Sequence, residues 1–213
     1  GWPCWSFSNH DVDRHVSRWA SHALEQKALA RQAAALLIAV KGSICLYQGE
    51  ELGLPQADIL FVELTDPPGI RFWPEYKGRD GERTPMPWDA GDPPNGFSTG
   101  RPWLPVKQEH SVLAVEIQNG DPDSTLGFYR HVLAFRRAHP ALIDGEIEFI
   151  KTSEPLLAFR RSNAGERLVC LYNLSPAAIH LTVKGTAELA LSQAAEKSGE
   201  KLALGPNGFA IFL

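Results

Sequence analysis

The residues best suited to chemistry lie near the start of the chain, where the triplet Asn9-His10-Asp11 follows a short apolar run at residues 2–7. A carboxylate beside an imidazole can bind polar ligand atoms and stabilise charge at a reacting centre. In enzymes built on parallel strands, such side chains gather at the C-terminal ends of the strands. The same residue types also form ordinary turns and helix caps, so the triplet alone is compatible with a simple turn.

A second charged block spans residues 78–89 and reads Gly-Arg-Asp-Gly-Glu-Arg-Thr-Pro-Met-Pro-Trp-Asp. Its two arginines, Arg79 and Arg83, can organise nearby carboxylates and lower their pKa. They could equally pair with acidic neighbours of the same block on the surface. No CxxC or His-rich spacing suggests a metal site, so we expect neither a metal nor a cofactor.

The composition bounds the class of protein. The chain has 213 residues, of which 44% are hydrophobic and 22% are charged, as in globular proteins with a real core. A net charge of -4 and a pI near 6.0 give no basic face, so we expect no nucleic-acid partner. No apolar run approaches the roughly 18 residues of a membrane span, and no secretory signal pattern is present. We therefore expect no membrane partner.

The three cysteines, Cys4, Cys45 and Cys170, each lie in an apolar stretch. Their odd number and settings favour buried free thiols over a disulfide framework, although Cys4 and Cys45 could face each other on neighbouring strands. Reduced thiols favour a reducing compartment, so the predicted location is the cytoplasm. The chain begins at Gly1 and its single methionine is Met86, so we expect a segment of a longer protein.

The first part of the chain has the pattern of a parallel βαβ unit. Residues 2–7 and 43–47 are predicted as buried strands, and residues 27–41 as the helix between them, ended by Gly42. The helix has an apolar face at helical spacing, formed by Leu29, Ala33, Leu36, Leu37 and Val40.

The pattern then changes twice. Residues 54–123 are rich in Pro, Gly, Trp and Asp and show little periodicity, which predicts an ordered loop over a site. Residues 126–139 are predicted as a helix ended by Pro140. Short strands separated by turn residues follow, at residues 146–150, 156–161, 168–174, 179–183, 188–191 and 208–213.

The blocks together resemble the α-amylase superfamily (glycoside hydrolase family 13). Residues 7–11 resemble the block that ends the seventh barrel strand of that family, and residues 48–53 resemble the ending of its eighth strand. Residues 78–89 resemble the Arg-Asp-x-x-Arg-Thr-Pro-Met-x-Trp segment of the α-glucosidase and oligo-1,6-glucosidase branch, where glutamine is common at the position of Pro87. The resemblance is specific from Gly1 to about residue 140.

The resemblance implies an α/β fold in two domains. Residues 1–143 would be the C-terminal part of a (β/α)8 TIM barrel, namely strands 7 and 8 with their helices, including a long loop after strand 8. Residues 144–213 would be a small antiparallel β-sandwich domain. A complete barrel takes about 250 residues, so we expect the missing elements in an upstream N-terminal part of the same protein or in a second chain. The chain alone should be inactive and insoluble or unfolded.

The resemblance also implies site roles. Asp11 would be the third, catalytic carboxylate of a retaining glycosidase, neither its nucleophile nor its acid/base. His10 would hydrogen-bond the same glucose unit, and Arg79 would reach the glucose-binding pocket. We expect Arg83 to form a structural ion pair and Arg14 to brace the strand-end turn. The nucleophilic Asp and the acid/base Glu have no match in this chain and are expected upstream.

For the remaining acidic, aromatic and histidine side chains, no catalytic role is expected. Glu50 and Glu51 are expected to support the barrel rim. Core filling and lining of the entrance both stay open for three tryptophans: Trp73, Trp88 and Trp103. The other histidines have no companion pattern and are interpreted as incidental: His15, His22, His110, His131, His139 and His180.

The predicted function is therefore part of a retaining α-glucosidase or α-glucosyltransferase acting on short, maltose-like α-glucosides by double displacement. A sucrose-, trehalose- or amylose-directed relative is the alternative within this class. A non-catalytic barrel ectodomain, related to amino-acid transporter heavy chains, is the alternative outside it; intact His10, Asp11 and Arg79 count against it. A free-standing carbohydrate-binding module at residues 144–213 is disfavoured because that segment has few aromatics expected to be exposed.

Overall fold

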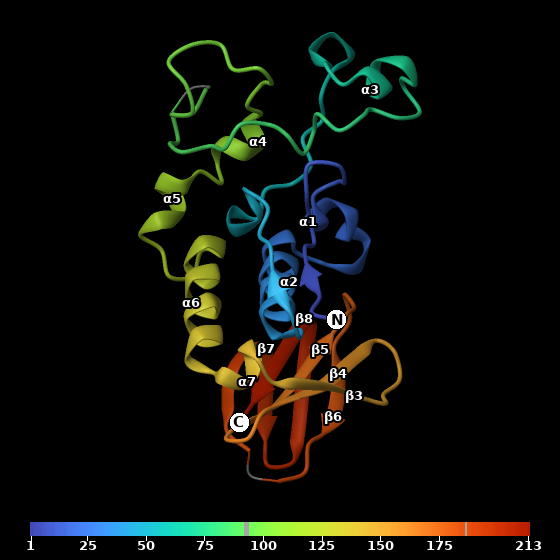
Figure 1. Cartoon of the computed structure of the whole chain (residues 1–213), viewed down its shortest axis with the longest axis vertical. Coiled ribbons are helices and arrows are strands. Elements are labelled where there is room, and N and C mark those ends of the chain that lie inside the picture. Colours follow the sequence, from blue (N-terminus) through green and yellow to red (C-terminus); the bar gives the residue numbers. More distant parts are fainter. Residues whose placement is uncertain (92–93, 186) are drawn as a thin grey trace. The chain divides into compact units, whose positions relative to one another are not determined.

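A computed structural model describes residues 1–91, 94–185 and 187–213 of the chain (Figure 1). The chain forms two compact units. Unit 1 comprises residues 1–5, 19–45 and 130–213, and unit 2 comprises residues 6–18 and 46–129. This grouping by contact differs from the domain boundary near residue 143 that the sequence suggests, and that boundary stays a prediction.

The predicted parallel strand pair is present in unit 1. Strand β1 (Cys4–Trp5) pairs in parallel with β2 (Ser43–Ile44), with Cys4 opposite Ser43. Both strands are shorter than predicted, and neither is buried: Trp5 is 42% exposed, and Ile44 is half-buried. The reason is that, among the described residues, each strand has only the other as a neighbour in its sheet. The prediction of buried thiols was consequently wrong for Cys4 and Cys45, which are exposed, and right for Cys170.

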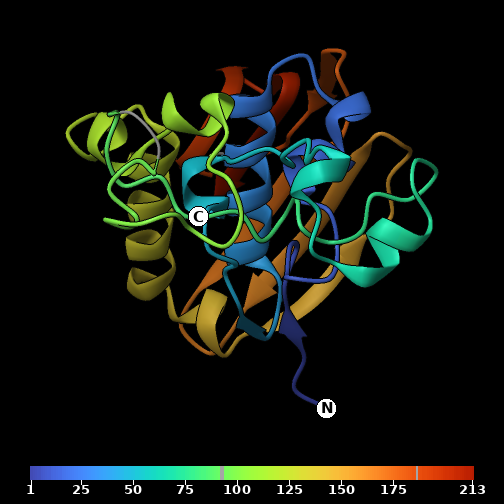
Figure 2. The same ribbon diagram turned by 90° about the horizontal axis from the view of Figure 1, so that it is seen from above.

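Helix α2 (Gln26–Ala39) connects the two strands and packs against β5 and β8 of the large sheet (Figure 2). Six alanines within it, five of them buried, let the backbones of helix and sheet approach closely. The helix ends at Val40, whose backbone is extended. Gly42 follows with φ +129, and a Cβ there would lie 2.5 Å from the Pro3 carbonyl oxygen, so only glycine fits this turn.

The rest of unit 1 is a six-stranded sheet in the order β3-β4-β5-β8-β6, with β7 also paired to β8. Every pairing in it is antiparallel, as predicted. The strands are β3 (Glu146–Ile150), β4 (Leu156–Ser162), β5 (Arg167–Asn173), β6 (Ile179–Thr182), β7 (Leu189–Ser198) and β8 (Lys201–Phe212).

Strands β7 and β8 are much longer than the predicted 188–191 and 208–213. Gly205, Pro206 and Gly208 read as turn residues in the sequence, but they lie inside β8. Between Gln193 and Ala195 of β7, the partner in β8 changes from Phe209 to Leu204, so residues 205–208 of β8 lie outside this ladder. Turn-forming residues inside the irregular ladder therefore explain why two short strands were predicted from the sequence instead of two long ones.

An aromatic stack forms the centre of the sheet core beneath α2. The rings of Phe159, Tyr172 and Phe209 follow one another with centroid spacings of 5.8 Å, and all three side chains are fully buried. The Tyr172 hydroxyl donates to the Ala35 carbonyl oxygen at 3.0 Å. Burial of each ring contributes roughly 1.5–3 kcal/mol, and the hydroxyl fixes where α2 lies on the sheet.

Unit 2 consists of short helices joined by ordered loops, many of them within the predicted loop 54–123. Helices of four or five residues are too short to produce a sequence periodicity, which explains why they were not predicted. Its elements are α1 (His15–Arg18), η2 (Glu50–Leu52), η3 (Phe61–Glu63), α3 (Pro67–Arg71), α4 (Gln108–Ser111) and α5 (Val115–Asn119). Two other short helices, η1 (Ala20–His22) and α7 (Pro140–Ile143), belong to unit 1, and α6 (Thr125–Ala138) has residues in both units.

Candidate active site

His10 and Asp11 lie at the tip of a tight turn. The Asn9 side-chain oxygen accepts a hydrogen bond from the Asp11 backbone N–H at 2.8 Å, and Asn9 forms an isolated antiparallel bridge with Val12. Asn9 thus acts as the turn residue that its type predicts. Both side chains that follow it are exposed, His10 by 69% and Asp11 by 50%, so they are available to a ligand.

Two arginines from the second charged block converge on Asp11. Arg79 Nη1 lies 2.9 Å and Arg83 Nη2 lies 3.1 Å from the same oxygen, Asp11 Oδ1. Arg83 Nε also donates to the His10 carbonyl oxygen at 2.8 Å. The ion pair predicted for Arg83 is present, and its partner is Asp11 itself. The structure therefore brings together all three predicted site residues, although 68 residues separate Asp11 from Arg79.

The charges around Asp11 keep it ionised. Desolvation by itself would raise the pKa of Asp11, but the hydrogen bond from Arg79 and the charges of His10, Arg79 and Arg83 outweigh it and hold that pKa below its ordinary value. Oδ1 is occupied by the two guanidinium groups, whereas Oδ2 faces His10 Nε2 at 3.4 Å. The arrangement leaves one carboxylate oxygen and one imidazole accessible at the surface.

A second carboxylate, Asp66, also contacts Arg79, and it was not identified from the sequence. It accepts hydrogen bonds from Arg79 Nη2 at 2.9 Å, from Arg79 Nε at 3.2 Å and from the Arg79 backbone N–H at 2.9 Å. Its side chain is only 1% exposed. The hydrogen bond from Arg79 is the main reason why the pKa of Asp66 lies below its ordinary value. In the sequence, Asp66 before Pro67-Pro68 reads simply as a helix cap.

Arg14 braces the turn from inside, as predicted. It is 1% exposed, and it donates to the Gln48 carbonyl oxygen at 2.8 Å and to the Glu82 carbonyl oxygen at 2.9 Å. Its guanidinium lies 5.3 Å from the centre of the Tyr47 ring. Gly49 has φ +88, and a Cβ there would lie 2.7 Å from Arg14 Nη1. Arg14 thus joins the segment after Asp11 to both of the other blocks.

Glu50 and Glu51 fold back on their own turn. The Glu50 carboxylate accepts from the Tyr47 backbone N–H at 2.6 Å, and Glu51 accepts from the Gly49 backbone N–H at 2.8 Å. Burial raises the pKa of Glu51. Both side chains therefore shape the turn at residues 47–51, in keeping with the supporting role predicted for them.

The interpretation of His15 as incidental was wrong. His15 is buried, and its Nδ1 lies 3.0 Å from Ser8 Oγ and 3.0 Å from Glu50 Oε1. Ser8 Oγ also accepts the His15 backbone N–H at 2.9 Å. Because Ser8 and His15 flank the turn that carries His10 and Asp11, this buried cluster closes the turn at its base.

Two other histidines also have structural partners. His110 is buried, with Nε2 3.0 Å from the Pro55 carbonyl oxygen, and burial lowers its pKa. His139 pairs with Glu166. No sequence spacing signals these contacts, since each partner comes from a distant segment.

The three tryptophans differ in their surroundings. Trp73 packs against the buried side chains of Ala57, Ile59 and Leu64, with its ring 5.6 Å from that of Phe61. It is therefore a core-filling residue. Trp88 and Trp103 are more than half exposed, and their lining of an entrance stays a prediction.

Two features are absent from the part of the chain that the structure describes. Within residues 1–91, 94–185 and 187–213, no group of three or more His, Cys, Asp or Glu side chains could hold a metal ion. In the same part of the chain, no helix combines the length and the apolar character needed to cross a membrane.

Comparison with known families gives one match to this chain. The model of the alpha-amylase catalytic domain matches residues 1–145. Among curated proteins, the chain is 54% identical over 175 residues to a probable alpha-glucosidase of Rhizobium meliloti, covering 82% of this chain and 32% of that protein. It is 34% identical over 194 residues to an oligo-1,6-glucosidase of Heyndrickxia coagulans, covering 82% of this chain and 35% of that protein.

Solved structures give the same picture. The alpha-glucosyl transfer enzyme XgtA superposes with a TM-score of 0.93 at 45% identity, over 100% of this chain and 40% of that one. The trehalulose synthase MutB (R284C mutant) superposes with a TM-score of 0.87 at 26% identity, over 100% of this chain and 43% of that one. The chain thus spans about a third of the curated relatives and about two fifths of these structures.

Proposed function

Because the chain belongs to the α-amylase catalytic-domain family, we propose that it is part of a retaining α-glucosidase or α-glucosyltransferase. The proposed substrates are short, maltose-like α-glucosides. The observation that carries this proposal is the convergence of Arg79 and Arg83 on Asp11, with His10 beside it. A glucosidase of the Rhizobium relative's kind and a glucosyl transfer enzyme of the XgtA kind use the same first step, so both activities are included.

The reaction in this proposal is a double displacement. An upstream carboxylate attacks the anomeric carbon while an upstream acid protonates the leaving oxygen, and water or another hydroxyl then releases the glucosyl group. Asp11 stays ionised and accepts hydrogen bonds from the sugar hydroxyls through Oδ2. Its negative charge stabilises the oxocarbenium-like transition state more than the neutral substrate, which is the requirement for acceleration. His10 and Arg79 hold the same glucose unit.

The family also gives a finer proposal for the fold. Strands β1 and β2 would be the seventh and eighth strands of the barrel, with residues 1–143 as its C-terminal part and residues 144–213 as a separate β-sandwich. The parallel register of β1 and β2 and the antiparallel sheet support this division. The three free cysteines support the cytoplasmic location proposed from the sequence.

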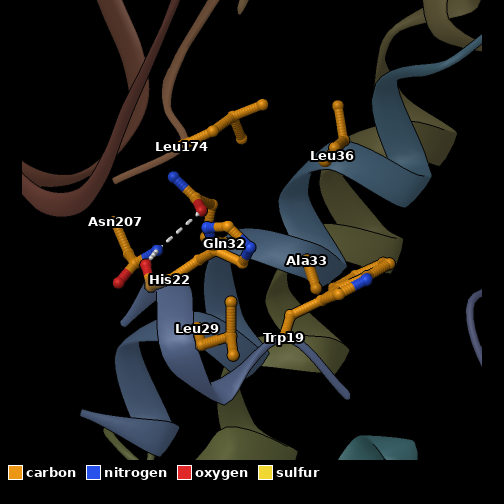
Figure 3. A pocket seen from close by; sticks show the side chains of 8 residues that line it. All are labelled: Trp19, His22, Leu29, Gln32, Ala33, Leu36, Leu174 and Asn207. Atoms are coloured by element: carbon orange, nitrogen blue, oxygen red, sulfur yellow. Dashed lines mark hydrogen bonds between the residues drawn. The ribbon is translucent and has the colours of Figure 1, made fainter. Parts of the chain in front are cut away.

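We further propose that the upstream part of the same polypeptide packs on the exposed flank of unit 1. Trp2, just before β1, and Trp5, within β1, are exposed. A cavity of about 340 Å³ lies between α2 and the sheet, and Trp19, Leu29 and Leu174 line it (Figure 3). The relatives are about three times as long as the matched segment, so a complementary portion exists in them. Co-expressed upstream part and residues 1–213 should co-elute in size-exclusion chromatography; separate elution would contradict the proposal.

Activity is tested on the complete polypeptide that contains this chain. We expect it to release glucose from maltose and p-nitrophenyl α-glucoside, or to transfer glucose to an added acceptor. Proton NMR during the first minutes should show the α anomer as the initial product, because two displacements retain configuration. Initial β-glucose would refute double displacement, and the absence of any turnover would favour a non-catalytic subunit.

A further inference from the structure

The Asp66 carboxylate makes more contacts with Arg79 than Asp11 does. Asp66 Oδ1 accepts from Nη2, and Oδ2 accepts from Nε and from the backbone N–H. Two parallel N–H···O bonds between a guanidinium and a carboxylate fix both the position and the plane of the guanidinium. The third bond fixes the backbone from which the side chain starts. Asp11, in contrast, receives a single hydrogen bond from Nη1.

Asp66 holds Arg79 instead of capping its own helix. It occupies the N-cap position of α3, where an Asp side chain usually accepts a backbone N–H of the first turn, but it makes no such bond. Since Pro67 and Pro68 have no N–H, the first turn of α3 offers this side chain few donors, and the carboxylate is free to bind Arg79.

A reciprocal contact keeps Asp66 in place. Asp80 Oδ2 accepts the backbone N–H groups of Asp66 at 2.9 Å and of Thr65 at 2.6 Å. Asp80 is itself fully buried. Asp80 therefore accepts from the backbone of residues 65–66, and Asp66 accepts from the backbone of Arg79, so the two segments hold each other. The approach is close: a Cβ on Gly78 would lie 2.8 Å from Asp66 Oδ2, and Gly78 has φ +76.

We propose that Asp66 is a positioning residue for the glucosyl-binding site: it fixes the Arg79 guanidinium so that Nη1 reaches Asp11 Oδ1 and leaves Asp11 Oδ2 aimed at the substrate. This proposal rests on the proposed function. It assigns a purpose to a buried carboxylate that does not touch the ligand. Arg79 without Asp66 would keep its charge, but it would lose the two bonds that define its plane.

The chain offers a matched control. Asp58 pairs with Lys77 and so joins nearly the same two segments as Asp66 and Arg79 do, but this pair is exposed and makes no contact with Asp11. Asp58→Asn removes one carboxylate and one ion pair, as Asp66→Asn does. A general effect of charge or of segment docking would appear in both variants, whereas an effect on the site would appear only in Asp66→Asn.

The first test measures kcat and KM of the complete enzyme on p-nitrophenyl α-glucoside. We expect Asp66→Asn to lower kcat by about 10- to 100-fold, because small misplacements of a positioned group cost up to that much, with KM changing far less. Asp58→Asn should stay within about twofold of wild type, as expected for an exposed pair. Asp66→Glu keeps the charge but shifts the carboxylate, so it should also remain impaired. Full activity of either Asp66 variant would overturn the proposal.

The second test does not depend on activity. Phenylglyoxal modifies arginine side chains, and peptide mass spectrometry gives the rate at each site. We expect Arg79 to react several-fold faster in Asp66→Asn than in wild type, with the exposed Arg71 unchanged as an internal reference. An unchanged Arg79 rate would overturn the proposal. If Asp66→Asn does not fold, Asp66→Glu is read in its place. If the wild-type enzyme shows no turnover but Arg79 reacts with phenylglyoxal as predicted, the proposed function is refuted, while the positioning of Arg79 by Asp66 stays supported.

Discussion

The contribution of buried Arg14 to stability can be predicted in magnitude, because the exposed Arg18 likewise donates to backbone carbonyl oxygens and serves as its control. Arg14 and Arg18 each donate to two backbone carbonyl oxygens, Arg14 to Gln48 and Glu82 and Arg18 to Asp13 and Phe7. Arg14 is 1% exposed, whereas Arg18 lies on the surface. We expect Arg14→Met to destabilise the protein far more than Arg18→Met does.

The magnitude follows from the bonds that are lost. A hydrogen bond that involves a charged group contributes about 1.5–3 kcal/mol, and Arg14 donates to two backbone carbonyl oxygens. Methionine fills the space of the aliphatic part but removes the donors to the Gln48 and Glu82 carbonyl oxygens, of which Glu82 keeps only the bond from the Tyr47 hydroxyl at 3.0 Å. We therefore expect the free energy of unfolding to fall by about 3–5 kcal/mol in Arg14→Met and by about 1 kcal/mol or less in Arg18→Met.

Thermal unfolding followed by circular dichroism measures this difference. In the complete polypeptide Arg14→Met should melt several degrees below wild type, since each kcal/mol lowers Tm by about 2–4 °C in a domain of 150–250 residues and by less in a larger one. Arg14→Lys keeps the charge but reaches one carbonyl at a time, and it should fall between the two. Equal melting temperatures for Arg14→Met and Arg18→Met would refute the bracing role of Arg14.

Three further predictions concern burial. Phe159→Ala should lower the free energy of unfolding by about 3–5 kcal/mol, because it opens a cavity in the aromatic stack. Phe149 is exposed, so Phe149→Ala should cost well under half of that. Equal costs of the two variants in denaturant titrations would be inconsistent with the sheet core described. Burial raises the pKa of Cys170 to about 12, so iodoacetamide at pH 8 should spare Cys170 in the folded complete polypeptide and label it after unfolding. Equal labelling rates of Cys170 before and after unfolding would contradict this. Burial lowers the pKa of His110, so below about pH 6.5 the unfolded state binds a proton that the folded state does not. The free energy of unfolding therefore decreases as the pH is lowered toward the folded-state pKa. His110→Asn should reduce the difference in the free energy of unfolding between pH 7.5 and pH 5.5, and an unchanged difference would exclude His110 as its source.

The sequence predicted the elements whose signals are local. The helix between two parallel strands was predicted from its apolar face and from Gly42, and the antiparallel sheet from short strands between turn residues. The union of His10, Asp11 and Arg79 was expected only from a family resemblance. No periodicity links residues that far apart, so composition and spacing alone could not have predicted it.

The missed features depend on contacts between distant segments. Asp66 reads as a helix cap next to two prolines, and its true role emerges only when residues 65–66 lie beside residues 79–80. His15 reads as incidental until the chain closes on Ser8 and Glu50. The exposure of Cys4 and Cys45 was unpredictable for a related reason: strand burial depends on which neighbours a strand has, and the apolar pattern of a strand does not specify them.

The most direct measurement of the central claim compares Asp11→Asn with Asp13→Asn in the complete polypeptide, using maltose and p-nitrophenyl α-glucoside. Both changes remove one exposed carboxylate from the same turn. Our account predicts that Asp11→Asn folds normally and loses about 10²- to 10³-fold in kcat, as when one electrostatic stabiliser of a transition state is removed. Asp13→Asn should retain nearly full activity. Near-normal turnover of Asp11→Asn would contradict the assignment of this site.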